Sequence, residues 1–372
     1  MTSTSTAATR PGTGPPKPAP PAREAPLHRR GAVLAVCAVL TALLLVSMLL
    51  AIGLGPAAVA PGDTARFLWA ALTGGTLPAG DLTAYHIVWE IRTPRVLLAA
   101  LVGAGLSAIG VAVQAMVRNA LADPFVLGIS SGASVGAVAV TVTGSLAVLG
   151  VHAMSVGAFA GALIASALVY LVSTRSGSLS PLRLVLIGVT VSFGCQAVMS
   201  VIVYLAPNSE ATSTILYWSM GSFGAANWES LPVVAGAVLL GTALLHRWSR
   251  TMDVMALGDE TAASLGVGPD HHRRLLLVLA SLVTGVMVAA SGAISFVGLV
   301  MPHLVRLVVG AGHARVLAVA PLAGAVFMVW TDLVARTAVA PRELPLGAIT
   351  ALVGVPVFIA LMQRRSYVFG GR

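Results

Sequence analysis

The chain has 372 residues, of which 57% are hydrophobic and only 9% are charged. So few charged residues cannot cover the surface of a soluble domain, and a mean hydropathy of +0.92 indicates a chain that crosses a membrane several times. The net charge of +9 follows the expected membrane topology, so we expect no nucleic-acid partner. Cys37 and Cys195 both lie in apolar runs and predict neither a disulfide framework nor a metal cluster.

The N-terminal region divides into a polar tail and a first apolar run. Residues 1–30 are rich in Pro, Thr, Ala and Ser, a composition that cannot bury a core, and we expect a disordered cytosolic tail there. Residues 31–54 are apolar over about twice the length of a signal-peptide core, which favours a membrane span. A cleaved signal peptide is the alternative, since residues 58–60 (AVA) resemble a cleavage site. Residues 31–372 are expected to form one transmembrane domain.

Nine further apolar stretches follow a polar outer segment. Within the outer segment at residues 61–90, residues 64–72 predict an interfacial amphipathic helix that carries Phe67 and Trp69. Together with the first run, the later stretches predict ten membrane-spanning helices. They are residues 94–117, 124–145, 150–173, 182–206, 231–246, 274–291, 294–310, 314–337 and 345–363. The sequence therefore predicts an all-α polytopic membrane protein.

The basic residues determine the expected orientation. An even number of spans puts both termini on one side, and Lys and Arg collect on the cytosolic side of membrane proteins. With the tail inside, seventeen of the 22 basic residues fall in segments expected to be cytosolic. The five on the outside are Arg66, Arg92, Arg95, Arg336 and Arg342. Both termini and the segment 247–274 are therefore expected in the cytosol.

That segment, 247–274, is the longest polar interruption between the apolar runs. Asp259 is expected to cap a short helix, residues 260–265 to continue it, and Gly266 to end it in a left-handed conformation. Ala262, Ala263 and Leu265 would form a small apolar face. An isolated helix below about 12 residues is marginal, so the chain's own spans or a partner's groove must hold it. A solvated loop and a docking helix both remain open on these residues alone.

Several motifs along the chain resemble one family. LGDETAASLGV, starting at Leu257, resembles the cytosolic coupling segment of the iron-chelate, haem and cobalamin permeases, which are the membrane subunits of type II ABC importers. VRNALADPFVLG at residues 117–128 resembles the RNPLADP signature of that family, with Ala120 in place of the usual proline. IRTPR at 91–95, GAISFVGLVMPHLVR at 292–306 and RELPLG at 342–347 also fit. The resemblance extends from about Arg92 to Leu361.

The resemblance implies a type II ABC importer permease fold with ten transmembrane helices, an inverted repeat and alternating access. Its partners would be two ABC ATPase subunits, an extracytoplasmic substrate-binding lipoprotein, and a second permease copy or a paralogue. The expected cargo is a ferric siderophore, then haem, then cobalamin. The chain itself would catalyse no reaction and hold no cofactor or resident metal. Residues 97–136 and 275–310 have weakly similar patterns, each a small-residue-rich apolar span followed by a break that contains proline and by another apolar segment. They would form the two inverted halves.

Three groups of residues take their roles from the resemblance. Leu257, Gly258, Asp259, Glu260, Ala262, Leu265 and Gly266 would couple the chain to the ATPase. Arg92, Arg95 and Arg336 would seat the binding protein, although Arg92 and Arg95 are equally suited to interfacial anchoring. Asn119, Leu121, Pro181 and Leu182 would form a cytosolic gate. Pro181 and Leu182 replace the small hydroxyl residues of cobalamin-type relatives.

A transporter of a different class stays open on the residues alone. The only lysine, Lys17, is not preceded by the glycine of a phosphate-binding loop, so an ATP motor must be another polypeptide. Asp332 and Arg336 lie one helical turn apart and predict a mutual ion pair, since an unpaired charge in a membrane is costly. As a proton-relay carboxylate, Asp332 would instead belong to a proton-coupled secondary transporter.

Overall fold

The computed structural model describes residues 30–57, 59–175, 177, 179–206 and 209–363. Helices and their connections make up these described ranges, and no β-strand occurs within them. The predicted all-α fold class is thereby confirmed. The predicted tail lies outside the described residues except for Arg30, which begins the first helix.

Within the described ranges, apolar helices lie at the positions of the ten predicted spans, although not all of them reach spanning length. Six are long and apolar enough to cross a membrane, and α9 with α10, bent by 56° at their junction, adds a seventh candidate. Three shorter apolar helices bring the apolar segments to ten. The long helices are α1 (Arg30–Gly53), α4 (Thr93–Val117), α6 (Ala153–Thr174), α7 (Pro181–Tyr204), α12 (Pro269–Ser291) and α14 (His313–Thr337). The bent pair is α9 (Leu231–Arg247) and α10 (Ser249–Ala256), and the shorter helices are α5 (Ile129–Thr143), α13 (Val297–Val309) and α15 (Leu346–Gln363).

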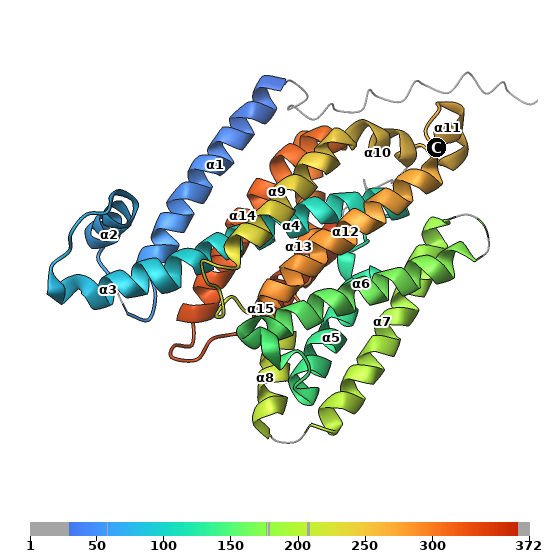
Figure 1. Cartoon of the computed structure of the whole chain (residues 1–372). Coiled ribbons are helices and arrows are strands. Elements are labelled where there is room, and N and C mark those ends of the chain that lie inside the picture. The colour runs from blue at the N-terminus through green and yellow to red at the C-terminus, as the bar shows by residue number, and fades with distance from the viewer. Residues whose placement is uncertain (1–29, 58, 176, 178, 207–208, 364–372) are drawn as a thin grey trace, which may run out of the picture.

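Short helices gather at the two ends of the bundle. At one end lie α2 (Pro61–Thr73), α3 (Leu82–His86) and α8 (Ser209–Ser219), as Figure 1 shows. At the other end lie α10 and α11 (Asp259–Ser264), together with the start of α1. Helix α2 includes the predicted amphipathic stretch and buries Phe67 while Trp69 stays 70% exposed. The alternation of buried and exposed aromatic residues is the pattern of an interfacial helix.

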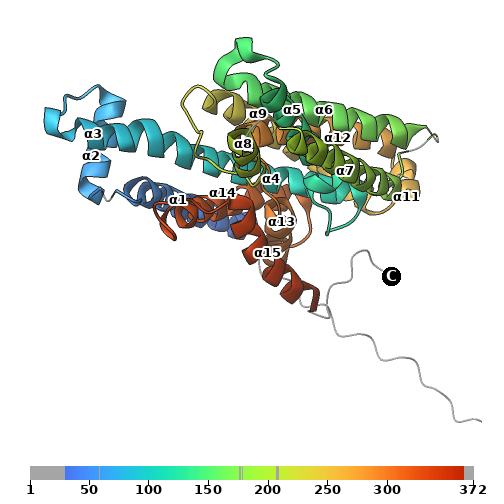
Figure 2. The same cartoon turned by 90° about the horizontal axis from the view of Figure 1, so that it is seen from below.

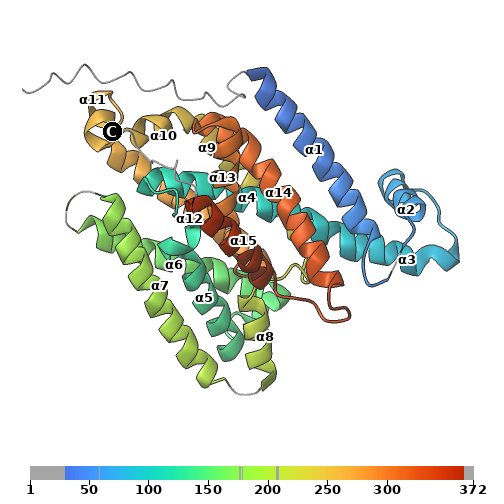
Figure 3. The ribbon, with the colours of Figure 1, turned by 180° about the vertical axis from the view of Figure 1, so that it is seen from behind.

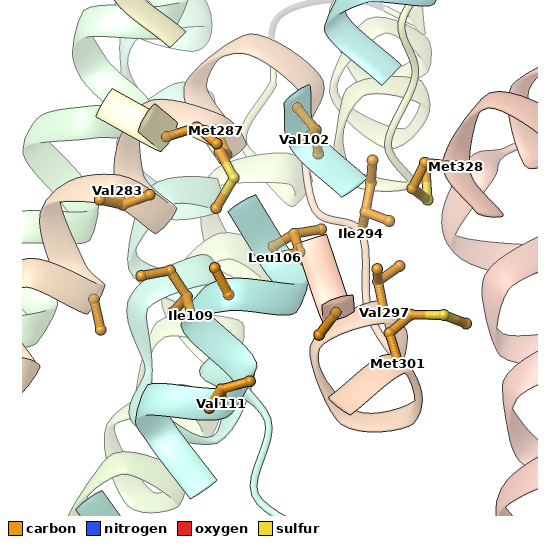
Figure 4. Packing of buried hydrophobic residues seen from close by; sticks show 14 of the residues in the cluster. Val102, Leu106, Ile109, Val111, Val283, Met287, Ile294, Val297, Met301 and Met328 are labelled. Atoms are coloured by element: carbon orange, nitrogen blue, oxygen red, sulfur yellow. The ribbon is translucent and has the colours of Figure 1, made fainter. Parts of the chain in front are cut away.

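Helix α4 is the centre of the packing. It buries 22 of its 25 residues and runs between α1, α13 and α14 on one side and α9 and α12 on the other (Figure 2). Its side chains Val102, Leu106 and Ile109 belong to one buried cluster with Met287 of α12 and Met328 of α14 (Figure 4). A Cβ atom on Gly103 would overlap the backbone of Gly324, and one on Gly110 would overlap the backbone of Gly298. Small residues at these positions therefore let α14 and α13 approach α4 closely.

The two echoing parts of the sequence form similar units. Helix α4 is followed by a break containing the 3₁₀ turn Pro124–Leu127 and then by α5, and α12 is followed by a break at residues 292–296 and then by α13. The breaks approach each other, because a Cβ on Gly298 would lie 3.0 Å from Pro124 Cδ. Asp123 is buried between them and accepts the backbone N–H of Phe125 at 2.9 Å. Irregular backbone is thus packed against protein, as required at membrane depth.

Helices α1 and α7 lie at opposite edges of the molecule (Figure 3). Helix α1 packs along α14. Only Leu184 and Gly188 of α7 are buried, and its exposed apolar side chains include Leu186, Phe193 and Val201. The apolar outer surfaces of both helices suit contact with lipid or another apolar protein surface.

Candidate functional site

The segment expected to form a short helix does so. Helix α11 spans Asp259–Ser264, and Gly266 follows it in the left-handed conformation with φ of 81°. The N–H groups of Gly266 and Val267 bond the carbonyls of Ala263 and Ala262, at 3.0 and 2.9 Å, which is a Schellman ending. The start differs from the prediction, because Gly258 with φ of 110° occupies the N-cap position. Asp259 is the first helical residue and makes no capping hydrogen bond.

Helix α11 has an exposed face and a buried face. Leu257 and Leu265 are 64% and 59% exposed, and Glu260 is exposed between them. Ala262 is fully buried and packs the helix onto the protein, so it does not share the exposed side with Leu265. The outward face therefore combines two large apolar side chains with one carboxylate. Large apolar groups at the tip of a short, exposed helix are typical of an interaction surface.

Two carboxylates fasten this segment to the membrane helices. Asp253 of α10 accepts the backbone N–H of His313 at 3.0 Å and contacts its Nδ1 at 2.6 Å, at the first residue of α14. Asp259 of α11 pairs with the guanidinium of Arg273, near the start of α12, and lies 3.6 Å from Arg118 Nη1. Arg273 is only 1% exposed. The protein's own helices thus hold a helix that is too short to be stable alone.

The four predicted gate residues lie near that same end. Asn119 and Leu121 follow the end of α4, where the Asn119 side chain accepts the backbone N–H of Leu121 at 2.9 Å. Leu121 is 39% exposed, and Leu182 in the first turn of α7 is 67% exposed. Arg273 bonds a backbone carbonyl just before each pair: Met116 O at 3.3 Å and Leu179 O at 3.0 Å. The gate segments therefore share one buried partner with α11.

At the opposite end, the three arginines expected at the outer mouth are buried. Arg92 is 4% exposed and donates to the carbonyls of Ile52, at 3.1 Å, and Gly53, at 2.8 Å, and to that of Ala57. Arg336, also 4% exposed, donates to Leu54 O at 2.9 Å and to Ala51 O. These two arginines satisfy the last carbonyls of α1, which have no partner within the helix. Interfacial snorkelling is not the arrangement found.

Arg95 joins the same region through carboxylates. Its Nε donates to Asp332 at 2.8 Å, and its two terminal nitrogens bind Glu343 at 2.7 and 3.0 Å. Asp332 is completely buried, and its second oxygen lies 3.3 Å from Arg336 Nε, so the predicted ion pair forms. We call Arg92, Arg95, Arg336, Asp332 and Glu343 the outer ion cluster. The seating of a binding protein by its arginines stays a prediction.

Glu343 lies in the connection between α14 and α15. Burial raises the pKa of its carboxyl, but the hydrogen bonds and charge of Arg95, with the Tyr217 hydroxyl and Arg336, more than offset this and hold the pKa below its usual range. A carboxyl whose pKa is depressed on folding stabilises the folded state above its unfolded pKa. That contribution is lost as the pH falls through the folded pKa. The pair of Glu343 with Arg95 therefore keeps its full contribution at neutral pH.

Sequence reasoning missed three residues that these sites depend on. From sequence, Arg273 in the run DHHRR is only one of the charges expected in the cytosol. Glu343 is only a member of the RELPLG motif, and Asp253 has no expected role. One signal was present for Arg273, since it begins a strongly apolar run in which a buried guanidinium requires partners. Its partners lie 14, 94 and 157 residues away. No local pattern specifies contacts over such separations.

Comparison with known proteins shows the family of the chain. The model of the FecCD transport family matches residues 43–364. The cobalamin import permease BtuC of Halobacterium salinarum is 44% identical over 285 residues, covering 76% of this chain and 75% of that protein. The hemin transport permease HmuU of Yersinia pestis is 38% identical over 303 residues, covering 81% and 88%. A solved structure described as an inward-facing conformation of a metal-chelate type ABC transporter has 31% identity and a TM-score of 0.77, covering 88% of this chain and 99% of that one.

Proposed function

The chain belongs to the FecCD transport family as a membrane-spanning permease subunit of an ABC importer. From that premise we propose where its ATPase and its binding protein dock, and what cargo it carries. Two ATPase subunits of the ABC type dock on α11, one on each permease copy. The supporting observation is the exposed surface that Glu260 of α11 forms with the flanking Leu257 and Leu265. Asp253 of α10 and Asp259 of α11 hold this segment to the membrane helices. Apolar anchors surrounding a charge are the chemistry that fits a partner's groove.

The docking surface belongs on the cytosolic side, together with both termini. The excess of basic residues in segments 247–274 and 1–30 supports this orientation. Movement of the docked ATPases would displace α11, and the segments with Asn119, Leu121, Pro181 and Leu182 would open or close the inner end of the path. Such rearrangement of packed helices around a fixed site is the usual form of alternating access.

A second permease copy completes the path. The exposed apolar surface of α7, with Leu186, Phe193 and Val201, supports an apolar interface between copies. The mass of the purified complex in detergent, measured by native mass spectrometry, tests this: two permease chains are expected. A complex that contains one permease chain would count against the pairing.

An extracytoplasmic binding protein delivers the cargo at the outer end, where Arg92, Arg95 and Arg336 were expected to seat it. Their buried contacts favour a supporting role, in which they fix the outer ends of α1, α4 and α14 beneath the contact surface. Replacing Arg95 with glutamine tests the direct role, with the exposed Arg342→Gln as the matched control. Both roles predict a lower unfolding temperature, because Asp332 loses a buried partner, but direct seating also predicts a salt-sensitive loss of capture at temperatures well below unfolding. The supporting role predicts that capture falls only as the permease unfolds.

The cargo is a metal held in an organic chelate, with a ferric siderophore as the first candidate. Relatives that carry hemin and Fe(3+)-citrate, at 38% and 36% identity, support this class. Cobalamin is the second candidate, because the relative at 44% identity is a cobalamin permease. Growth rescue of a host lacking its own importers tests both, with ferric siderophores, haem and cobalamin supplied singly. Rescue by cobalamin alone would overturn the siderophore assignment, and rescue by none would overturn the chelate class.

A further inference from the structure

The guanidinium of Arg273 occupies an unusual position. It lies near the start of α12 with 1% of the residue exposed, the largest fully buried side chain in the described part of the chain. It donates in three directions: Nε to Met116 O at 3.3 Å, Nη1 to Leu179 O at 3.0 Å, and Nη2 to Asp259. Asp270, one turn earlier, lies 3.5 Å from Nη1. A buried guanidinium is tolerated because these acceptors compensate for its lost hydration.

Each of the three acceptors belongs to a different functional segment. Met116 is in the last turn of α4, where carbonyls lack partners within the helix, and the segment with Asn119 and Leu121 begins directly after it. The carbonyl of Leu179 lies two residues before Pro181, at the start of α7. Asp259 opens α11, the helix with the exposed docking face. One side chain therefore touches the docking helix and the backbone next to both predicted gate segments.

A second arginine reinforces the connection to α4. Arg118 adopts the left-handed conformation with φ of 51° directly after α4, a position that usually favours glycine, and its guanidinium lies 3.6 Å from the Asp259 carboxylate. The Asp259 carboxylate is thus held by one arginine from α12 and by another from the end of α4. A displacement of α11 acts on both arginines through the same atom, Asp259 Oδ1.

The chemistry of the guanidinium makes this connection stiff. Its donors are fixed in one plane, so it cannot follow one acceptor without changing its geometry toward the other two. Breaking any one bond leaves a buried donor or acceptor unsatisfied, which is strongly unfavourable. If α11 moves, the favourable outcome is that the ends of α4 and of the connection before α7 move with it.

We propose that Arg273 is the positioning residue that transmits displacement of α11 to the two gate segments, at Asn119–Leu121 and Pro181–Leu182. The proposal rests on the docking of an ATPase at α11. Arg273 contacts neither the cargo nor the ATPase in this scheme, and it acts through Asp259, Met116 and Leu179. Its removal should separate ATP hydrolysis from transport without preventing assembly.

The test is Arg273→Lys in the full complex of permease, ATPase and binding protein, reconstituted in proteoliposomes. Lysine keeps the positive charge but has no planar fork to bind three diverging acceptors. Arg274→Lys is the matched control: Arg274 is the next residue, is exposed, and lies over the Tyr170 ring at 5.6 Å. We expect the R273K complex to retain its ATPase and its hydrolysis rate, while the cargo moved per ATP falls about tenfold. The R274K complex should move as much cargo per ATP as the unmodified complex.

Other outcomes would overturn the proposal in distinguishable ways. An unchanged ratio of transport to hydrolysis in R273K means that Arg273 transmits nothing. Loss of the ATPase from R273K means that Arg273 only supports the docking surface, which leaves the proposed function intact. Retention of the ATPase by a permease with a disrupted α11 face would instead remove the proposed function itself.

A milder variant covers the case in which the R273K permease does not fold. Asp259→Asn weakens only the hydrogen bond from Arg273 to Asp259, and Asp259 is partly exposed, so the bonds from Arg273 to the two buried carbonyls persist. Transport per ATP is expected to fall in D259N alone. If the R273K permease folds, the losses in the double variant D259N/R273K should not add, as for residues that act through one contact. D259N with an unaltered ratio, or additive losses, would contradict transmission through this pair.

Discussion

Replacing Glu260 and Leu265 together with lysine is expected to abolish co-purification of the ATPase while the permease still reaches the membrane. Both side chains are exposed on α11, so the substitutions do not disturb the packing of Ala262 beneath them. Truncation of an interface anchor typically costs about 2 kcal/mol or more, so two replacements should lower the affinity by about a thousandfold. The measurement is the ratio of ATPase to permease after purification through a tag on the permease.

The control places the same two changes elsewhere. Glu229 and Leu82 are both exposed, with a 79% exposed side chain and a 46% exposed residue respectively, and lie at the end of the bundle away from α11. Glu229→Lys with Leu82→Lys should leave the ATPase ratio unchanged. If the variant with both Glu260 and Leu265 replaced by lysine retains the same ratio of ATPase to permease, α11 is not the docking helix.

Replacing Asp332 with asparagine is expected to destabilise the permease more than any surface substitution. Asp332 is completely buried and shares its carboxylate between Arg95 and Arg336, so the neutral amide would leave two buried guanidinium groups undercompensated. Removing one partner of a buried ion pair typically costs about 3–5 kcal/mol. The loss of stability should appear as a lower midpoint temperature of thermal unfolding in detergent. This midpoint is measured by size-exclusion chromatography of the heated samples.

Asp63→Asn supplies the matched comparison. It makes the same chemical change in an ion pair with Arg66 at 3.1 Å, where both side chains are about half exposed. Pairs of this kind contribute little, so the midpoint should barely move. If D332N and D63N unfold at the same temperature, the outer ion cluster does not hold α1, α4 and α14 together.

The outer ion cluster also bears on the alternative of a secondary transporter. A proton relay needs a carboxyl that can take up and release protons along a path. Asp332 is held by Arg95 at 2.8 Å and by Arg336 at 3.3 Å, next to arginines that satisfy the end of α1. This arrangement favours the structural ion pair over the relay, because moving a proton onto Asp332 would leave both arginines without their shared partner.

The membrane spans could be predicted from sequence because each depends on one local property. A run of apolar residues long enough to cross the hydrocarbon core must be helical there, since every backbone group needs a partner within the segment. The predicted residues 94–117 and 314–337 differ from α4 and α14 by one residue at most at either end. The ending of α11 was predictable for the same reason, because Gly266 is a local signal.

The functional contacts could not be predicted in this way. Asp259 was expected to cap its own helix, but its carboxylate pairs with Arg273, fourteen residues later, because the chain folds back between α11 and α12. Arg92 and Arg95 were expected at an exposed mouth, yet the start of α4 is covered on all sides and their charges turn inward. Such outcomes depend on which helices become neighbours, and the apolar pattern leaves that open.

The most direct test of the account is uphill accumulation in proteoliposomes. The central claim is that this chain moves its cargo only with energy supplied by a separate ATPase. Vesicles that contain the permease, its ATPase and its binding protein should accumulate a radiolabelled ferric siderophore against a gradient when ATP is supplied to the ATPase. The permease alone, with an imposed proton gradient and no ATPase, should accumulate none. Accumulation by the permease alone would contradict the account and assign the chain to the proton-coupled transporters.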